Sequence, residues 1–511
     1  MSKFNKKSKS LTTYEGAPAV NKKLEDSWVN SLCSSFLCGK YYESGYNQTR
    51  RYADLTRQMI KQRGPEFVAN AADFSRNCLG MRSTSALTAA LLNDSQWNGK
   101  RGFYRSFFHR PDDVAEVFAA ADNYHMKRSH ALVRGAGDYL SSLSWYKLGK
   151  YKLSSKEYNM YDLINLTHAH SYAIDQYKNG TLPVPETWET LISAAKSYEE
   201  KADCWAYLVE NGKLGLMALL RNLRNLVKYC SNKDINWWDK YVCSKLDPIN
   251  ESARTAISNS LVFPYRFYVA FKEFDRAYDA TGHYISKDKD CIYYNVRAAL
   301  VEAFLFSIEA VNGFDGNSLI VLDVSGSMDS RISENSVLSI KEVGACYAEI
   351  LKKACRRGNV DIVKFGLSAK LYRECSYQDE FSDIADIAKN DGCGCSTFID
   401  SVWPLVTDKR YDRVFIISDM QVMETSFHLS RWGLIDRAQK AMSFSEWCTA
   451  NEHTPKVYSF DLSNYSREPS QFGGNINYFT ALSPEVLKFI EILESGKTVC
   501  DYIDSCEWKR W

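Results

Sequence analysis

The chain has 511 residues, of which 45% are hydrophobic, 14% aromatic and 25% charged. This composition excludes a disordered chain, and the length exceeds what one hydrophobic core usually holds, so we expect two or three folded domains. The lysine-rich start is unlike a secretory signal, and no apolar run approaches the ~20 residues that span a bilayer, which predicts a cytoplasmic protein without membrane contact.

Charge is divided unevenly along the chain, although the net charge is only +2. Residues 1–310 hold 42 Lys and Arg against 33 Asp and Glu, whereas residues 311–511 hold 22 against 29. The basic excess is concentrated in residues 1–150, with 23 against 13. A basic N-terminal part favours a polyanionic partner.

The 15 cysteines are scattered and none forms a C-x-x-C pair, so we expect reduced thiols. Cys393 and Cys395 could form half of a zinc site. Without a second pair or a histidine nearby, an ordinary loop is the preferred interpretation.

Residues 1–20 are expected to form a flexible basic N-terminus, and residues 21–312 an all-helical region. Apolar residues recur there at spacings of three and four, which is typical of amphipathic helices. Pro65 and Pro111, each followed by acidic residues, indicate helix starts. Many short helices in series favour a HEAT-like helical-repeat array, although no strict period is visible.

The pattern changes after residue 312. Residues 319–323 form a continuous apolar run, which predicts a buried strand, and a turn then leads into a helix whose apolar face includes Val337, Ile340, Tyr347 and Leu351. Further strands are predicted at 360–365, 414–417 and 457–460, with helices near 434–448 and 484–494. This alternation predicts a doubly wound, Rossmann-like α/β domain with a parallel sheet over residues 313–511.

Asp323, Ser325 and Ser327 follow the first predicted strand of this domain. Ligands bind beyond the carboxyl ends of the strands in an open parallel sheet. One carboxylate and two hydroxyls are hard oxygen donors, which favour Mg²⁺, Mn²⁺ or Ca²⁺ over zinc, and we expect Mg²⁺ first. The alternative is an inert turn whose hydroxyls cap the next helix.

The D-x-S-x-S run resembles the metal-ion-dependent adhesion site of von Willebrand A domains. That resemblance implies that Thr397, before a helix expected to start near Phe398, and Asp419, at the end of another predicted strand, are further ligands. Thr397 departs from the family pattern because Ser396 precedes it where glycine is usual, and Ser396 is an alternative ligand. The resemblance further implies a protein partner that donates a carboxylate to the metal.

An enzyme is the other class of function that an aspartate-led loop suggests. Phosphoaspartyl chemistry needs a second carboxylate two residues after the first, and Ser325 stands there. The chain has no P-loop, no H-E-x-x-H motif and no nucleophile elbow. We therefore expect no catalytic activity.

Five stretches of the first 310 residues resemble the TROVE module of Ro-type RNA-binding proteins. They are residues 14–19 (YEGAPA), 80–83 (GMRS), 110–113 (RPDD), 212–225 (GKLGLMALLRNLRN) and 263–267 (FPYRF). The order of a helical region before a von Willebrand A-like domain matches as well. The resemblance implies a helical ring and a partner that is a small non-coding RNA: Y-type RNA on its outer surface, and single-stranded ends of misfolded RNA in its hole.

Basic residues with neighbouring aromatics or histidines are the candidates for RNA contact. The candidates are Lys127, Arg128, Arg134, Lys147, Lys150, Lys152, His168, Arg221 and Arg224. Another patch of basic and aromatic residues lies around Arg101 and Arg105, and we assign its aromatic side chains to the core. The alternatives are a solvated basic face, a core histidine at His168, and arginines that pair within the stack. We expect a monomer that binds RNA; the competing hypothesis is a metal-dependent protein-interaction scaffold without RNA.

Overall fold

The computed structural model describes the chain from residue 11 to residue 505, except residues 22, 36, 38–41, 152, 154–156, 261, 281–286, 310–312, 333–335, 424–440, 464, 466, 470–471, 473–475, 480–489 and 491–492. The chain divides into two compact units. Residues 1–50 and 308–497 form the α/β unit, and residues 51–307 and 498–511 form the helical unit. Each unit is described here by itself.

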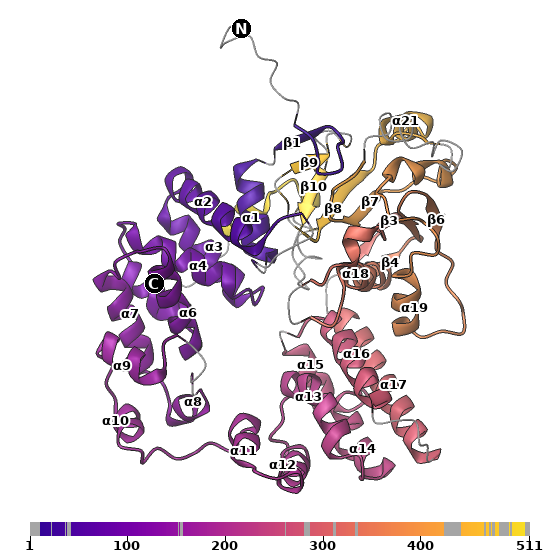
Figure 1. Ribbon diagram of the computed structural model, residues 1–511. Coiled ribbons are helices and arrows are strands. Elements are labelled where there is room, and N and C mark those ends of the chain that lie inside the picture. The colour runs from indigo at the N-terminus through magenta and orange to yellow at the C-terminus, as the bar shows by residue number, and fades with distance from the viewer. Residues whose placement is uncertain are drawn as a thin grey trace. The chain divides into compact units, whose positions relative to one another are not determined.

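A six-stranded sheet forms the centre of the α/β unit (Figure 1). Its strand order is β10 (Ile476–Phe479), β8 (Lys456–Asp461), β7 (Arg413–Ser418), β3 (Ser318–Asp323), β5 (Val360–Phe365) and β6 (Ala369–Leu371). The first five strands are parallel, and β6 pairs with β5 in the antiparallel sense. The predicted strands β3, β5, β7 and β8 are confirmed, whereas the sheet is mixed rather than wholly parallel.

Both faces of the sheet are covered, as a doubly wound fold requires. Val321 of β3 and Ile416 of β7 belong to a buried cluster that includes Trp403 and Trp447. On the opposite face, α18 (Ile340–Ala354) lies so close that a Cβ atom at Gly344 would be 2.9 Å from Leu322 Cδ1. Successive strand residues point to opposite faces, so a continuously apolar strand fills both layers.

The other elements of the α/β unit are short. They are β1 (Ala19–Asn21), α1 (Leu24–Ser34), β2 (Phe314–Asp315), η3 (Gly326–Asp329), β4 (Cys355–Arg357), α19 (Glu380–Ile387), η4 (Ile399–Ser401), η5 (Trp403–Leu405), α21 (Phe444–Ala450) and β9 (Arg467–Pro469). The helix expected near Phe398 is instead a pair of short 3₁₀ turns, the second containing Pro404. The second half of the helix predicted at 434–448 overlaps α21, whereas residues 434–440 and most of the helix predicted at 484–494 lie outside the described residues.

The helical unit confirms the predicted all-helical region. Its helices are α2 (Gly45–Arg63, which begins in the α/β unit), α3 (Pro65–Asn77), α4 (Ser83–Leu91), η1 (Leu92–Asp94), α5 (Lys100–Phe107), α6 (Pro111–Asn123), α7 (His130–Ser141), α8 (Trp145–Lys150), α9 (Met160–Thr167), α10 (Tyr172–Lys178), α11 (Trp188–Ala194), α12 (Tyr198–Glu210), α13 (Leu216–Tyr229), α14 (Ile235–Tyr241), η2 (Cys243–Lys245), α15 (Glu251–Ser258), α16 (Tyr265–Ala280), α17 (Lys287–Glu309) and α23 (Val499–Ser505). Pro65 and Pro111 occupy first helical positions, as predicted.

Packing between alternate helices explains how short helices build a stable stack. Helix α4 packs on α6, α5 on α7, and α7 on α9, so each helix contacts the next but one, as in repeat arrays. Helices α6, α7 and α9 lie along one part of the helical unit (Figure 1). Two glycines allow α7 to approach its neighbours closely. A Cβ atom at Gly135 would lie 2.6 Å from Tyr104 Cβ, and one at Gly137 would lie 2.7 Å from the Thr167 carbonyl oxygen. Any side chain at either position would force the helices apart.

Each end of the chain belongs to a different unit from the one that the sequence predicts. β1 pairs with β9 of the α/β unit, so residues 11–21 are not the flexible tail expected for residues 1–20. At the other end, α23 belongs to the helical unit, where Tyr502 contacts Phe74 and Asp504 pairs with Arg63. A single boundary at residue 312 therefore assigns neither the N-terminal nor the C-terminal segment to its correct unit.

One described helical segment, Cys291–Glu309 of α17, is long and apolar enough to cross a membrane. The prediction that no such stretch exists is wrong in this respect. Half of the segment is buried inside the protein, and core helices pass the same test of length and composition, so it is weak evidence for a membrane span.

Candidate metal centre and candidate RNA interface

The loop after β3 gathers the first three predicted metal ligands. Asp323 is the last residue of β3, and its carboxylate accepts hydrogen bonds from the Ser325 backbone N–H at 2.8 Å and from Ser418 Oγ at 2.6 Å. Ser325 Oγ lies 3.4 Å from Ser327 Oγ. All of these side chains are buried. Two hydroxyls and a carboxylate therefore converge at the carboxyl edge of the sheet.

Asp419 brings a second carboxylate to the same place. Burial, with the charges of Asp323 and then Asp461, raises its pKa to about 8, although hydrogen bonds from Ser327 and the Gln421 backbone N–H oppose the shift. Burial also raises the pKa of Asp323, against hydrogen bonds from Ser418 and Ser325. Two buried carboxylates that repel one another, with hydroxyl oxygens beside them, suit a hard divalent cation, whose charge would offset the repulsion. The donor set therefore fits the metal that the sequence predicts.

Thr397 lies in a loop that is held against this group of ligands. The Gly326 backbone N–H donates to the Cys395 carbonyl at 2.9 Å, and Asn390 Nδ2 donates to the Val324 carbonyl at 2.8 Å. Thr397 is buried and the alternative ligand Ser396 is half-buried. The structure thus brings Asp323, Ser325, Ser327 and Asp419 into one interacting group and places the loop of Thr397 beside it.

Cysteine ligands are not favoured in this region. The described cysteines all carry free thiols, and Cys393 is buried while Cys395 is exposed. Among the described residues, no three His, Cys, Asp or Glu side chains form a group that could hold a metal. The candidate centre instead combines two carboxylates with hydroxyls, and an ordinary loop remains the interpretation of Cys393 and Cys395.

The N-terminal segment supports the loop of the candidate metal ligand Asp419, a role that sequence reasoning missed. Gln421 is fully buried, and its side chain accepts from the Tyr14 backbone N–H at 2.9 Å and donates to the Asp419 carbonyl at 3.2 Å. Thr13 Oγ1 donates to the Val422 carbonyl at 2.8 Å. The backbone N–H of Met423 donates to the Thr397 carbonyl at 2.8 Å. Residues 13–17, which we call the N-terminal hairpin, therefore hold the segment 421–423, which contacts both Asp419 and Thr397.

The predicted RNA-binding residues divide into exposed and paired cations. Lys127, Arg134, Lys147, His168 and Arg221 are exposed. His168 caps the C-terminal end of α9 with φ 53°, and its exposure shows that the alternative of a core histidine is wrong. Lys152 lies outside the described residues.

Three of the predicted cations already have acidic partners. Arg128 Nη2 contacts both carboxylate oxygens of Asp122 at 2.6 and 2.8 Å. Arg224 pairs with Glu273 at 3.1 Å, and Lys150 with Glu189 at 3.6 Å. Their charges are largely offset, which makes them weaker candidates for phosphate contact than the exposed cations.

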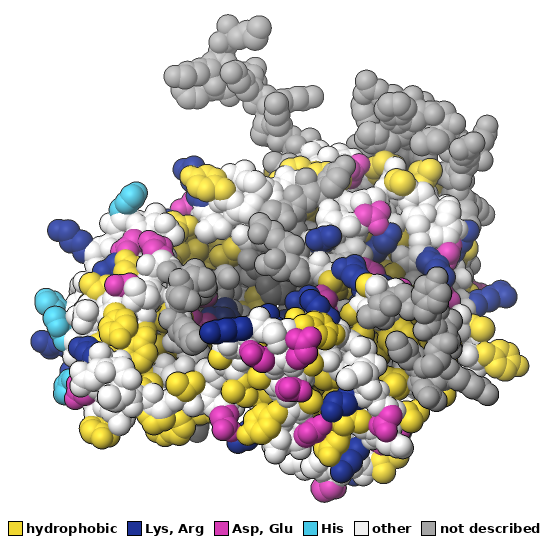
Figure 2. Space-filling model, turned by 60° about the horizontal axis from the view of Figure 1, so that its bottom comes forward, with side chains coloured by type: hydrophobic (Ala, Val, Ile, Leu, Met, Phe, Trp, Pro, Cys, Tyr) yellow, Lys and Arg dark blue, Asp and Glu magenta, His cyan; other side chains and the backbone are white. Residues whose placement is uncertain are grey.

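Exposed aromatic side chains surround the C-terminal end of α7, and sequence reasoning missed them. Trp145 and Tyr146 are about half exposed directly before Lys147, and Tyr172 is 79% exposed two residues after His170. The His170 backbone N–H donates to Ser141 Oγ at 3.1 Å, which brings the histidine segment to the end of α7. Figure 2 shows histidines gathered among Lys and Arg at one edge of the molecule. We call Trp145, Tyr146, Lys147, His168, His170 and Tyr172 the α7-end cluster.

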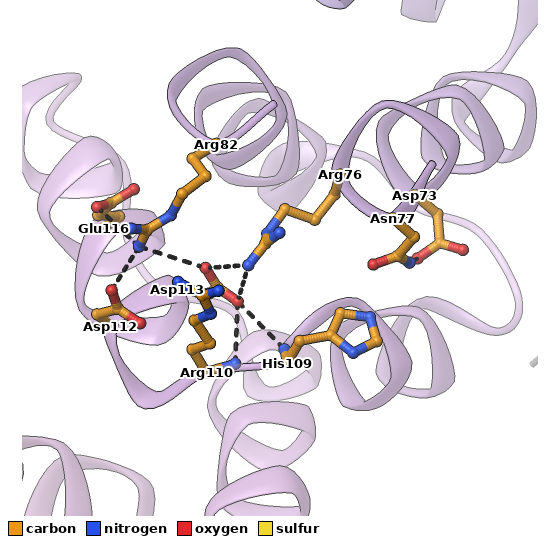
Figure 3. Close-up of polar contacts among 9 residues, drawn as sticks. All are labelled: Asp73, Arg76, Asn77, Arg82, His109, Arg110, Asp112, Asp113 and Glu116. Carbon is orange, nitrogen blue, oxygen red and sulfur yellow. Dashed lines mark hydrogen bonds and ion pairs between the residues drawn. The ribbon is translucent and has the colours of Figure 1, made fainter. Parts of the chain in front are cut away.

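A largely buried ion-pair network joins helices α3 and α6 (Figure 3). Arg76 Nη2 donates to both oxygens of Asp113 at 2.8 and 2.9 Å, and Asp113 also accepts from two backbone N–H groups before α6. Arg82 pairs with Asp112 at 2.5 Å and with Glu116 at 3.2 Å. The network joins α3, α6 and the start of α4, so these two arginines serve the fold.

Residues 167–284 match the TROVE domain. This span begins at the end of α9 and includes the 212–225 and 263–267 stretches, but not the three earlier stretches of the resemblance. The Ro (RSR) protein of Deinococcus radiodurans has a similar structure, with a TM-score of 0.58 and 16% sequence identity over 91% of this chain and 98% of that chain. At that identity the likeness concerns the fold. No curated protein matches the sequence.

Proposed function

We propose that this chain binds structured small non-coding RNA through its helical unit, as a cytoplasmic and monomeric ribonucleoprotein that serves RNA quality control or stability. The observation that carries the proposal is the TROVE match, together with the α7-end cluster. Three residues of this cluster lie at the start of the matched span, and the other three lie shortly before it. The Deinococcus protein of similar fold is a Ro protein, which supports the same class of function.

The chemistry of the α7-end cluster suits unpaired RNA. Lysine neutralises phosphates, and exposed Trp and Tyr rings stack on bases that are not in a duplex. His168 and His170 donate or accept hydrogen bonds at base edges or the 2′-OH. We propose Y-type RNA on the outer surface and single-stranded ends of misfolded RNA in a central hole of the helical array.

The α/β unit has a separate role in this proposal. We infer that it is a von Willebrand A-like, non-catalytic domain that holds Mg²⁺, or alternatively Mn²⁺ or Ca²⁺, on Asp323, Ser325, Ser327, Thr397 and Asp419. A partner protein would supply a carboxylate to the bound cation. The buried pair Asp323 and Asp419 carries this inference, because two adjacent carboxylates without a cation are electrostatically unfavourable.

RNA binding is tested by fluorescence anisotropy with a labelled structured RNA between about 50 and 200 mM salt. Affinity should fall steeply with log salt, EDTA should leave it nearly unchanged, and Lys147→Glu should weaken it. If the chain binds RNA no better than albumin at low salt, the proposal is wrong. The metal-dependent scaffold is then the better hypothesis, provided that Mg²⁺ binding persists.

A further inference from the structure

Helices α5 and α7 form a seam that is lined by charged side chains. Gly135 of α7 lies against the α5 backbone, since a Cβ atom there would be 2.8 Å from the Arg101 carbonyl oxygen and 3.2 Å from the Arg105 backbone nitrogen. Arg101 and Arg105 are four residues apart on α5, and Arg134 and Asp138 are four residues apart on α7. Each pair therefore lies on one face of its helix.

A bidentate ion pair shows that the Arg101 face of α5 meets the Asp138 face of α7 beside the Gly135 contact. Arg101 Nε and Nη2 donate to Asp138 at 2.7 and 2.8 Å. The hydrogen bond from Arg101, and the charges of Arg101, Arg105 and Arg134, hold the pKa of Asp138 below its usual value. All three arginines therefore act on one carboxylate, although they come from two helices. Sequence reasoning assigned them to separate patches.

The seam has more positive charge than its own carboxylate offsets. Arg101 occupies both oxygens of Asp138. The side chains of Arg105 and Arg134 are exposed, and no hydrogen bond or ion pair of theirs is found within the described part of the chain. Three arginines against one carboxylate leave two positive charges close together. Such a local excess of positive charge attracts an anion.

We propose that the α5–α7 seam, defined by Arg101, Arg105, Arg134 and Asp138, is a binding site for the phosphate backbone of RNA. This inference rests on the proposed function and assigns one of its contact surfaces. Arginine's planar fork matches phosphate oxygens in a bidentate manner. The same helix α7 ends in the α7-end cluster, whose aromatic rings suit bases. An RNA strand therefore fits the neighbouring surfaces better than an acidic peptide does.

The first test removes the two unpaired cations together, as Arg105→Gln with Arg134→Gln. The matched control, Lys61→Gln with Arg276→Gln, removes the same charge from exposed positions on α2 and α16. Loss of two phosphate contacts should reduce the slope of log affinity against log salt by about 1.5 and weaken binding roughly 30-fold at 0.1 M salt. The control should bind almost as the unchanged chain does.

The second test has the opposite sign, which a folding defect cannot imitate. Asp138→Asn removes the one carboxylate of the seam and frees Arg101, so RNA should bind about fivefold more tightly at 0.1 M salt. The probe in both tests is a labelled single-stranded RNA oligonucleotide, and polyglutamate is the competitor.

The outcomes separate this inference from the proposed function. If the unchanged chain binds no RNA, both are refuted. If it binds RNA but the double variant keeps the unchanged slope, or Asp138→Asn fails to tighten binding, the seam alone is refuted. Polyglutamate that competes as well as RNA at equal charge would overturn the assignment to phosphate and indicate an acidic protein partner.

Discussion

Replacing Asp419 by asparagine should stabilise the metal-free protein and abolish its response to Mg²⁺. Asp419 is fully buried, and burial with the neighbouring charge of Asp323 raises its pKa from 3.8 to about 8. Asparagine has the same shape and no charge, and its carbonyl oxygen can still accept the hydrogen bond from the Gln421 backbone N–H, which is 3.1 Å long in the native protein. The variant therefore removes the repulsion and keeps the local geometry.

The sign of the pH dependence follows from the raised pKa. Between about pH 4 and pH 8 the folded protein keeps a proton on Asp419 that the unfolded chain releases, so the free energy of unfolding falls as the pH rises through this window. At about 1.4 kcal/mol for each pKa unit, the cost is about 4 kcal/mol at pH 7. That corresponds to a melting temperature roughly 10 °C lower than without the charge.

Thermal unfolding in EDTA, followed by tryptophan fluorescence, measures this effect. The melting temperature of the native chain should fall from pH 5 to pH 8, whereas that of Asp419→Asn should change much less. Mg²⁺ at saturating concentration should raise the melting temperature of the native chain at pH 8 and leave the variant unchanged. If both proteins melt together in EDTA at pH 8, or if Mg²⁺ stabilises both equally, the reasoning about the carboxylate pair is refuted.

Three further predictions concern the metal loop and the helix packing. Thr397→Ala should weaken Mn²⁺ binding, measured by electron paramagnetic resonance, while Ser396→Ala should not, because Thr397 is buried and Ser396 is only half-buried. The reverse result would make Ser396 the ligand. Gln421→Leu should lower Mn²⁺ affinity at least about tenfold by releasing the N-terminal hairpin from the Asp419 loop, and unchanged affinity would disprove that support. Gly135→Ala should cost about 1–3 kcal/mol of stability by forcing α5 from α7, whereas Gly215→Ala, with no atom within 4 Å of the new Cβ, should melt near the native temperature.

The central strands could be predicted from the sequence because they are buried on both faces. Residues 318–323, 360–365, 413–418 and 456–461 are rich in β-branched and aromatic residues, and the predicted bounds agree with the observed ones within one residue. Asp323 and Asp419 could likewise be placed, because each directly follows a strand of this kind. The edge strands were missed because three or four residues at a sheet edge have no such pattern.

The N-terminal hairpin could not be predicted, because its contacts are long-range. The hydrogen bond from Thr13 to Val422 joins residues 409 positions apart, and that from Tyr14 to Gln421 joins residues 407 apart. Tyr14 belongs to the 14–19 stretch, but that stretch carries no information on where it docks, and neither Thr13 nor Gln421 belongs to a periodic segment. A polar segment rich in turn residues reads as a flexible tail unless its docking surface is known.

For the candidate RNA-binding residues, the sequence shows where the cations are but not which of them form ion pairs. Arg128 and Arg134 look alike in the sequence, yet Arg128 is held by Asp122 while Arg134 lies exposed at the α5–α7 seam. Likewise, Arg224 meets Glu273 on another helix, 49 residues away. A sequence therefore identifies the pool of cations on a helical array, and the packing between helices decides which of them keep an uncompensated charge. Phosphate recognition depends on the cations that have no acidic partner. An RNA interface on a helical array therefore follows the seams between helices more than the basic segments of the chain.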